Sequence, residues 1–476
     1  MRSPGFLGPS YLARARDLAY QQLVNLYPVL VESKTGRDVG AFYATPGLTL
    51  ITTVDDGPVR ALHRFNSIAN HPMGDTLLVV SGANLYSLDT TFTATNLGMI
   101  GTTSSAVSII DNGTQAAIFD GTQGYLTTGG ALSPLSLPFS NPGSAIQLDG
   151  FGLVVANDTQ NFYQSDLLDL STWNSLKFGI ANVKSDNIIA LASLHRQVFV
   201  IKETNTEFWV NAGLPNFTFQ RLEGVFTEAG CVAVNSVARG GEALFWLAAT
   251  DQGFPAVVKC TGYAPEPVST DAQHYAFSRY SRVDDAIAYV YYQEGHRFYV
   301  LSFPSGNETW VYDDTVGLWH QRAALGNGLF SRHWGQCAAV FAGKLIIGDY
   351  RNGNLYTYDQ GAATDNGTQR KWVRGWRALP KPTMHGTRFN ALTIDMTNGI
   401  GVPDGTDPLV MLRWSDDGGH NWSSEVFAHA GKTGETGRRV KFKRLGSTRQ
   451  NVGTDRIFEL SSTDAFTVAL IGADLE

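Results

Sequence analysis

The sequence has few cysteines, no long apolar run and a modest content of charge. Only three of its 476 residues are cysteines, Cys231, Cys260 and Cys337, and their spacing fits neither a zinc site nor an even disulfide framework. We therefore expect free thiols in a protein assembled in a reducing cytosol, with no metal ion and no cofactor. No stretch approaches the roughly 18 uncharged apolar residues of a membrane span. The first residues also lack an apolar region followed by a cleavage site, so no secretion signal is expected.

The motifs of several functional classes are missing as well. The ten histidines are scattered, and neither H-E-x-x-H nor a phosphate-binding glycine loop occurs. Nothing in the order of the acidic, Arg and Tyr residues marks the paired carboxylates of a glycosidase, or the arginine cluster and tyrosine nucleophile of a sialidase. The net charge of -7 does not indicate the overall basic surface that is typical of nucleic-acid-binding proteins. We predict no catalytic residues and a protein that is not an enzyme.

What the sequence does contain is a repeated pair of strands. The pair is clearest at Asp75 to Asp89, DTLLVVSGANLYSLD, where Gly82 and Asn84 supply turn chemistry between two strand-like runs. Six similar stretches follow, at residues 114–128, 152–166, 196–210, 242–262, 296–313 and 343–359. The interval of roughly 40 to 50 residues is typical of a propeller blade of about four strands. The sequence therefore predicts an all-β protein with a six- or seven-bladed β-propeller, and a generic antiparallel sandwich is the alternative.

The chain divides into three predicted parts. Residues 1–60 form an N-terminal arm that contains the one good helix candidate, Tyr11 to Gln22, and then an extended segment, residues 40–48. A strand from this segment is expected to pair with the last blade, because an unclosed propeller would expose two sheet edges. The propeller is assigned to residues 61–365. Residues 366–476 alternate apolar and polar positions without helices, which predicts a C-terminal β-sandwich or jelly roll.

One short motif stands out in the C-terminal part. Residues 415–422, SDDGGHNW, resemble an Asp-box hairpin turn. In that design an acid, here Asp417, accepts main-chain N–H groups after Ser415, Gly419 takes a special backbone angle, and Trp422 packs on the strands. Asp boxes are common in sialidases and other propellers, but they are folding devices away from catalysis. We predict a structural role for this turn.

The one concentrated basic run is Arg438 to Arg444. Its alternation indicates a strand with Arg439, Lys441 and Lys443 on one outward face. Two interpretations remain: a solvated face that guards an edge strand, or a surface that docks on an acidic partner or on phosphates in a channel.

The order of these pieces resembles a known family, the packaged-DNA stabilisation proteins of short-tailed bacteriophages, also called the tail hub or nozzle. The stretches that carry the resemblance are residues 25–28 (NLYP), 43–48 (YATPGL), 82–86, 163–173, 188–191, 207–209 (EFW), 412–415 (LRWS), 444–447 (RLGS) and 456–458 (RIF). The resemblance covers nearly the whole chain.

The resemblance implies a structural virion protein without catalytic residues, located in the tail and assembled in the host cytoplasm. It implies a homo-hexameric tube below the portal and its adaptor ring, which retains packaged DNA and lets double-stranded DNA pass without sequence recognition. Docking surfaces for tail fibres or spikes and for a plug or needle are also implied. The alternatives are a carbohydrate-binding or sialidase-like propeller and a cellular propeller scaffold.

Overall fold

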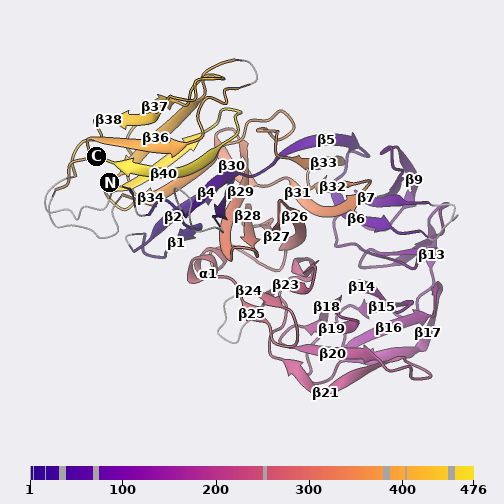
Figure 1. Ribbon diagram of the computed structural model, residues 1–476. Helices are drawn as coiled ribbons and strands as arrows, with labels where there is room; N and C mark the ends of the chain where they lie inside the picture. The colour runs from indigo at the N-terminus through magenta and orange to yellow at the C-terminus, as the bar shows by residue number, and fades with distance from the viewer. Residues whose placement is uncertain are drawn as a thin grey trace.

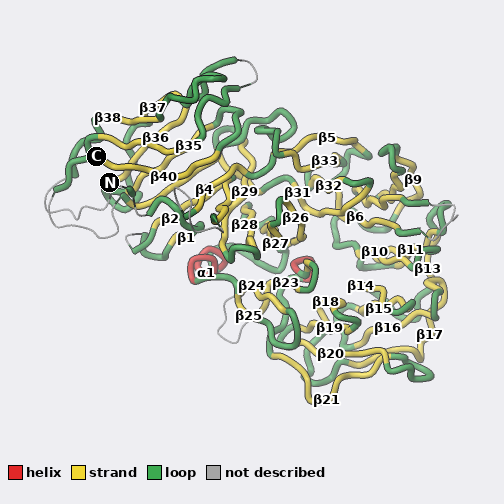
Figure 2. The backbone as a smooth tube through the Cα atoms, viewed as in Figure 1, coloured by secondary structure: helices red, strands yellow, loops and turns green. Residues whose placement is uncertain are grey.

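The computed structural model describes residues 2–3, 5–16, 18–31, 39–67, 74–249, 255–378, 386–402, 405–448 and 456–476. In these ranges almost all regular structure is β-strand. Seven blades surround a common axis, and a two-sheet sandwich lies beside the ring (Figures 1 and 2). The predicted fold, a propeller followed by a sandwich, is confirmed, and the blades number seven.

Each blade is an antiparallel sheet of four main strands. Blade 1 contains β6 (Val59–Phe65), β7 (Thr76–Ser81), β8 (Asn84–Leu88) and β9 (Ala94–Met99). Blade 2 contains β10 (Ser108–Asp111), β11 (Ala116–Phe119), β12 (Gly124–Thr127) and β13 (Ser133–Leu135). Blade 3 contains β14 (Pro142–Leu148), β15 (Phe151–Ala156), β16 (Asn161–Asp166) and β17 (Asp169–Ile180). Blade 4 contains β18 (Ile188–Leu194), β19 (Gln197–Lys202), β20 (Thr206–Asn211) and β21 (Phe219–Thr227).

The remaining blades follow the same plan. Blade 5 contains β22 (Ala238–Gly240), β23 (Ala243–Ala248), β24 (Ala256–Cys260) and β25 (Glu266–Pro267). Blade 6 contains β26 (Ile287–Gln293), β27 (His296–Phe303), β28 (Glu308–Asp313) and β29 (Leu318–Gly326), with β30 (Leu329–Arg332) paired to the end of β29. Blade 7 contains β31 (Gly335–Phe341), β32 (Lys344–Asp349), β33 (Asn354–Asp359) and β5 (Gly47–Thr53).

The seven predicted hairpins are the second and third strands of the seven blades. In the first hairpin, Leu78 and Val80 belong to the same buried cluster as Ile118 of blade 2. Leu77 and Val79, on the opposite face of β7, share a cluster with Ile346 of blade 7. A strand that is apolar on both faces therefore packs against two neighbouring blades at once. This is why apolar and polar residues do not alternate in these strands. The turn of the fifth hairpin, residues 250–254, lies outside the described residues.

The ring is closed by a strand from the N-terminal segment. β5 pairs antiparallel with β33, from Gly47 opposite Asp359 to Thr53 opposite Asn354, and forms the outer strand of blade 7. This strand starts within the extended segment that the sequence indicated. Three strands from one end of the propeller and one from the other thus form a single sheet, and this joins the first and last blades.

Two sheets form the sandwich, and both include N-terminal strands. One sheet has the order β2 (Tyr20–Val24), β34 (Trp372–Arg377), β39 (Ile457–Ser462), β36 (Leu409–Ser415) and β37 (Val426–His429), with β1 (Tyr11–Leu12) beside β2. The other has the order β3 (Leu26–Leu30), β4 (Gly40–Ala44), β40 (Ala469–Leu475), β35 (Ala391–Met396) and β38 (Val440–Lys443). The core between them includes Leu23, Phe42, Trp376, Phe458 and Leu470.

The predicted helix at Tyr11–Gln22 is wrong. These residues contain β1 and the start of β2, and β2 lies between β34 and the blade 6 strand β29. The buried side chains of Tyr20 and Leu23 pack in this setting, so strand pairing overrides the local helical pattern. Within the described residues the regular helices are α1 (Asp271–Phe277) and a 3-10 turn at Val234–Ser236. No helix in the described part of the chain is long and apolar enough to cross a membrane.

Candidate functional site

The Asp-box-like turn connects β36 to β37 in the sandwich. The Oδ1 atom of Asp417 accepts hydrogen bonds from the main-chain N–H groups of His420 (3.1 Å) and Asn421 (2.8 Å). The Ser415 hydroxyl donates to the same carboxylate at 2.7 Å and accepts from the N–H of Gly419 at 2.9 Å. These hydrogen bonds hold the pKa of the Asp417 carboxyl well below its ordinary value. The four residues that the sequence singled out are therefore brought together, with Gly419 at a φ of +89°.

Trp422 leaves this turn toward the N-terminal segment. Its ring lies 6.2 Å from the ring of Tyr20 in β2, and the Arg413 guanidinium lies 4.6 Å from the Trp422 ring centroid. Arg413 also forms an ion pair with Glu459, 2.6 Å between Nη2 and Oε1. The turn therefore packs on the N-terminal strand β2 and on the Arg413–Glu459 ion pair. The sequence of the turn does not reveal either contact.

The basic run forms the edge strand β38. Val440 and Phe442 are buried, whereas Arg439 and Lys443 are exposed. Lys441 is half-buried, and its Nζ lies 2.7 and 2.9 Å from the two carboxylate oxygens of Glu476. The hydrogen bond from Lys441 lowers the pKa of Glu476. Arg439 and Lys443 are therefore better placed for an external partner than Lys441, whose charge is neutralised within the chain.

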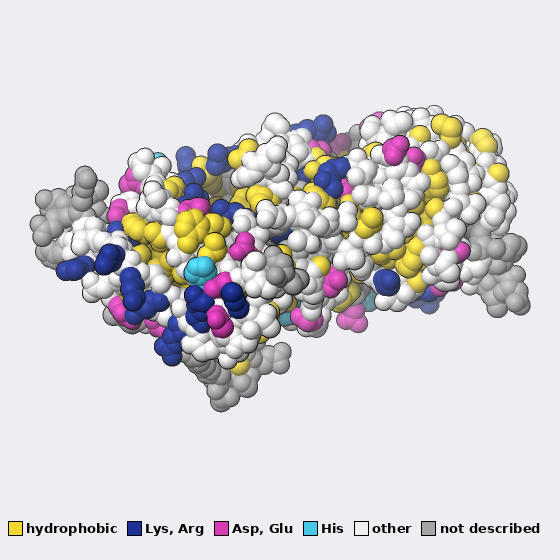
Figure 3. Space-filling model, turned by 90° about the horizontal axis from the view of Figure 1, so that it is seen from above, with side chains coloured by type: hydrophobic (Ala, Val, Ile, Leu, Met, Phe, Trp, Pro, Cys, Tyr) yellow, Lys and Arg dark blue, Asp and Glu magenta, His cyan; other side chains and the backbone are white. Residues whose placement is uncertain are grey.

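Basic side chains are more frequent on the sandwich than on the propeller in the face shown in Figure 3, where the sandwich lies to the left. Arg438, next to β38, contributes little free charge, because its Nη1 lies 2.8 Å from Asp407 and 2.9 Å from Glu435. The sequence counted Arg438 in the basic run, and only the structure shows which members of the run are paired.

The propeller encloses a central cavity of about 910 Å³, which the first strand of every blade helps to line. Its charged lining residues are mainly acidic: Arg60, Asp120, Asp158, Glu203, Arg239 and Asp284. Four carboxylates against two guanidinium groups make this cavity unsuited to hold a phosphate backbone.

A side chain missed by the sequence analysis joins propeller and sandwich. Asn25, between β2 and β3, donates from Nδ2 to the carbonyl oxygens of Ala323 in β29 and of Lys371 before β34, both at 2.8 Å. Its main chain has a φ of +55° and accepts from the N–H of Thr45 at 3.0 Å. The signal available in the sequence was an Asn between apolar strand residues, because Asn tolerates the left-handed region better than most residues do.

Several solved structures are similar to this chain at low sequence identity. The computationally designed Ika8 protein is 11% identical, with 65% of this chain and 99% of that chain covered and a TM-score of 0.39. The N-terminal domain of Nup159 is 9% identical, with 71% and 98% covered and a TM-score of 0.40. The Pan2 WD40 domain of Neurospora crassa is 10% identical, with 70% and 97% covered and a TM-score of 0.40. The comparison with curated proteins gives no significant match.

Two family models match the chain in succession. The model described as bacteriophage P22 Gp10, beta-propeller, matches residues 6–363. The model described as bacteriophage P22 Gp10, beta-sandwich, matches residues 371–475. Both parts of the fold are thus similar to the same phage protein, in the same order.

Proposed function

The chain belongs to the family of bacteriophage P22 Gp10 and is a structural protein of a phage tail, and on this premise we propose that it is the tail nozzle of a short-tailed phage. The observation that carries the proposal is the match of both the propeller and the sandwich to one tail protein family. In this role it docks below the portal and adaptor ring as a homo-hexamer, retains the packaged DNA and forms its exit channel. Tail fibres or spikes and a plug or needle bind to its outer surfaces.

The joint between propeller and sandwich supports a mechanical role in the tail. β2 of the sandwich pairs in parallel with β29 of blade 6, so one sheet runs from the propeller into the sandwich. Asn25 adds side-chain hydrogen bonds to both sides of this joint. A joint made of main-chain and buried side-chain hydrogen bonds resists relative motion of two domains better than a flexible linker does.

The charge of the protein is also consistent with a conduit. The net charge is -7, and the charged side chains that line the propeller cavity are four carboxylates and two guanidinium groups. A strongly basic lumen would retain DNA by counterion release, whereas an acidic or neutral wall lets the polyanion pass. The proposal includes no catalytic step, and assembly takes place in the host cytoplasm.

The proposal is tested by imaging tails and by removing the protein. Particle averaging of assembled tails is expected to show six copies in a ring, and virions made without the protein are expected to package DNA and then lose it. The released DNA can be measured by its sensitivity to nuclease. Monomeric copies in assembled tails, or full DNA retention without the protein, would overturn the nozzle assignment.

A further inference from the structure

Blade 4 buries an amine, a carboxyl group and a second carboxylate in mutual contact. Lys202, the last residue of β19, has a fully buried side chain, and its Nζ lies 2.7 Å from Oδ1 of Asp186. The same Nζ lies 3.8 Å from Oε1 of Glu207 in β20, which is also fully buried. Asp186 comes from residues 181–187, the connection between blades 3 and 4. A buried lysine in contact with a carboxylate oxygen places an amine beside an acyl group.

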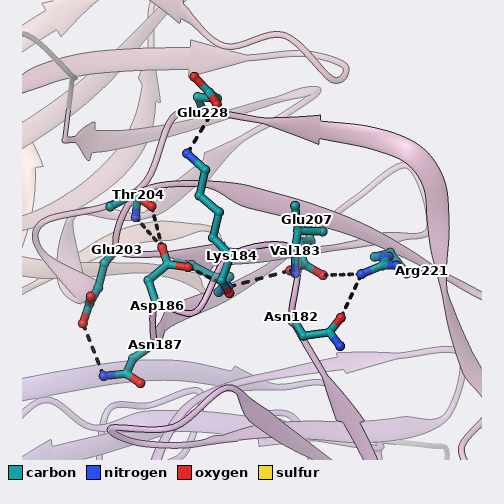
Figure 4. A network of polar contacts seen from close by, with 11 residues as sticks. Asn182, Val183, Lys184, Asp186, Asn187, Glu203, Thr204, Glu207, Arg221 and Glu228 are labelled. Atoms are coloured by element: carbon teal, nitrogen blue, oxygen red, sulfur yellow. Dashed lines mark hydrogen bonds and ion pairs between the residues drawn. The ribbon is translucent and has the colours of Figure 1, made fainter.

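The other oxygen of Asp186 is held by donors. Oδ2 accepts hydrogen bonds from the main-chain N–H and the hydroxyl of Thr204, both at 2.8 Å (Figure 4). The buried amide of Asn205, with its nitrogen turned to Asp186, adds contacts of 3.2 and 3.3 Å. Donors aimed at one carboxyl oxygen stabilise the charge that develops there when a nucleophile attacks the carbon.

Glu207 is placed to move protons. Its Oε1 accepts the main-chain N–H of Val183 at 2.9 Å, which fixes the carboxylate near Lys202 (Figure 4). Its Oε2 is buried and has no hydrogen-bond partner among the described residues, and Nη1 of Arg221 lies 3.9 Å away. The oxygen that faces the Lys202 ammonium is Oε1, at 3.8 Å from Nζ, and it is the atom placed to act as a general base.

We propose that Lys202 and Asp186 condense spontaneously to an intramolecular isopeptide bond, with Glu207 as the catalytic proton carrier. Nζ forms a bond to Cγ of Asp186, and the Cγ–Oδ1 bond breaks. Of the three ammonium protons, one stays on the amide nitrogen and two leave with Oδ1 as water, transferred through Glu207, which ends unchanged. An ammonium and a carboxylate thus become a neutral amide and one water molecule, and no oxidant or other co-reactant is needed.

The surroundings favour this condensation over a permanent ion pair. Burial opposes ionisation of Asp186, but the hydrogen bonds from Lys202 and Thr204 hold its pKa below its ordinary value, so Asp186 starts as a carboxylate. The Lys202 side chain is fully buried and that of Asp186 is 10% exposed, so keeping both charges there is costly, and amide formation removes both. The fixed geometry also accelerates the reaction, because effective molarities of well-oriented groups reach about 10⁵ to 10⁸ M.

The bond would close the segment from residue 186 to residue 202. It ties the connection between blades 3 and 4 to the second strand of blade 4, at a place where Asn187 and Glu203 also line the central cavity. A covalent link there prevents the connection from peeling away from the blade.

The experiment is intact-mass measurement of the denatured full chain, followed by peptide mapping. The parent protein is expected to be lighter than its sequence by one water, with residues 186 and 202 in one branched peptide. Asp186→Asn is expected to lose ammonia and reach the same final mass, since the product is the same amide. Lys202→Arg keeps the positive charge and is expected to show its full sequence mass.

Glu207→Gln separates the catalyst from the reactants. Its Oε1 can still accept from Val183, so the chain is expected to fold. The bond is expected to form at least about 100-fold more slowly than in the parent. The half-buried pair Lys177–Asp166, 2.5 Å apart, lacks a neighbouring buried Glu among the described residues and is the internal control, and its peptides are expected to remain separate. A parent protein of full sequence mass with separate peptides for residues 186 and 202 overturns the proposal. Unchanged bond formation in Glu207→Gln overturns the role of Glu207.

Discussion

The side-chain amide of Asn25 pairs with the main chain of Ala323 as a neighbouring strand would. Nδ2 of Asn25 donates to the carbonyl oxygen of Ala323 at 2.8 Å, and its Oδ1 accepts from the N–H of Ala323 at 3.0 Å. Asn25 lies between β2 and β3, which belong to different sheets, and its side chain pairs with the main chain of β29 where β2 ends. The chain can therefore turn from one sheet of the sandwich to the other without leaving buried polar groups of blade 6 unpaired.

Replacing Asn25 is expected to loosen the joint between the two domains. Asn25→Ala removes three side-chain hydrogen bonds and places a Cβ residue other than Asn at a positive φ, which together cost about 2–4 kcal/mol of unfolding free energy. Asn25→Gly loses the same hydrogen bonds without the backbone strain, so it is expected to be the milder variant by about 1 kcal/mol. Chemical denaturation of the two variants measures both effects. Parent-like stability of both would show that the joint does not depend on this side chain.

Acid sensitivity of the turn follows from Asp417. Its pKa is lower in the folded protein than its ordinary value of 3.8, so its stabilising contribution is complete above that value and is lost as the pH falls toward the folded pKa. Asp417→Asn is expected to lower stability near neutral pH and to flatten the loss of stability below about pH 4. Thermal melting as a function of pH checks this. Neither this variant nor Asp417→Ala should alter an enzymatic activity, and loss of a glycosidase activity at unchanged stability would favour a sialidase-like protein.

Trp422 is expected to stabilise the contact between the C-terminal turn and the N-terminal strand β2. Trp422→Ala removes the ring that Tyr20 and Arg413 contact, and because the ring is half-buried the expected loss is about 2 kcal/mol. Trp422→Phe keeps an aromatic ring and is the matched control. Denaturation curves that are identical for Trp422→Ala and the parent would contradict the packing role.

The basic edge strand is expected to affect assembly more than folding. Replacement of Arg439, Lys441 and Lys443 by Gln should cost less than about half a kcal/mol for each exposed position. If the strand docks on an acidic ring, virions with the triple variant package DNA but leak it, and the defect resembles added salt because exposed pairs are screened over about 8–10 Å.

The three basic side chains differ in their contacts, so their substitutions are expected to differ in effect. Arg439→Gln with Lys443→Gln should reproduce most of the assembly defect, whereas Lys441→Gln alone should be mild, because Glu476 already neutralises Lys441. DNA retention across a salt series compares the variants. Retention and tail attachment equal to the parent at every salt concentration would identify the run as a solvated face.

Two buried histidines predict a loss of stability in mild acid. Burial and the nearby Arg322 hold the pKa of His320 and of His333 well below 6.5. The unfolded chain therefore binds more protons than the folded chain below about pH 6.5, and stability falls as the pH decreases from there. His320→Phe suits the position between the rings of Tyr27 and Phe298 and should reduce this loss.

The matched control is the exposed His195, at a φ of +49° that Asn tolerates. His195→Asn is expected to keep the pH dependence of the parent. Stability measured from about pH 7 to about pH 5 compares the three proteins. An unchanged slope in His320→Phe would show that another group dominates the titration.

The sequence by itself determined the features that depend on neighbouring residues. An apolar run, a turn with Gly82 and Asn84 and a second strand specify a hairpin locally, and seven such hairpins predict a closed ring. The alternation of Val440 and Phe442 with charged residues likewise determined which side of β38 is buried. Ser415 and Asp417 lie close enough in the chain for their hydrogen bonds to be read from the motif.

Only the tertiary structure decided the features that join distant parts of the chain. Residues near Tyr20 have a helical pattern, but they form a strand because β34 and β29 offer main-chain partners on both sides. Glu476 neutralises Lys441 across 35 positions, so the pairing is not visible in the basic run. Lys202 and Asp186 meet because a blade connection folds back on a hairpin. Local patterns fix strand and turn propensity, whereas partners far along the chain are chosen by burial and by the need to pair every buried main-chain group.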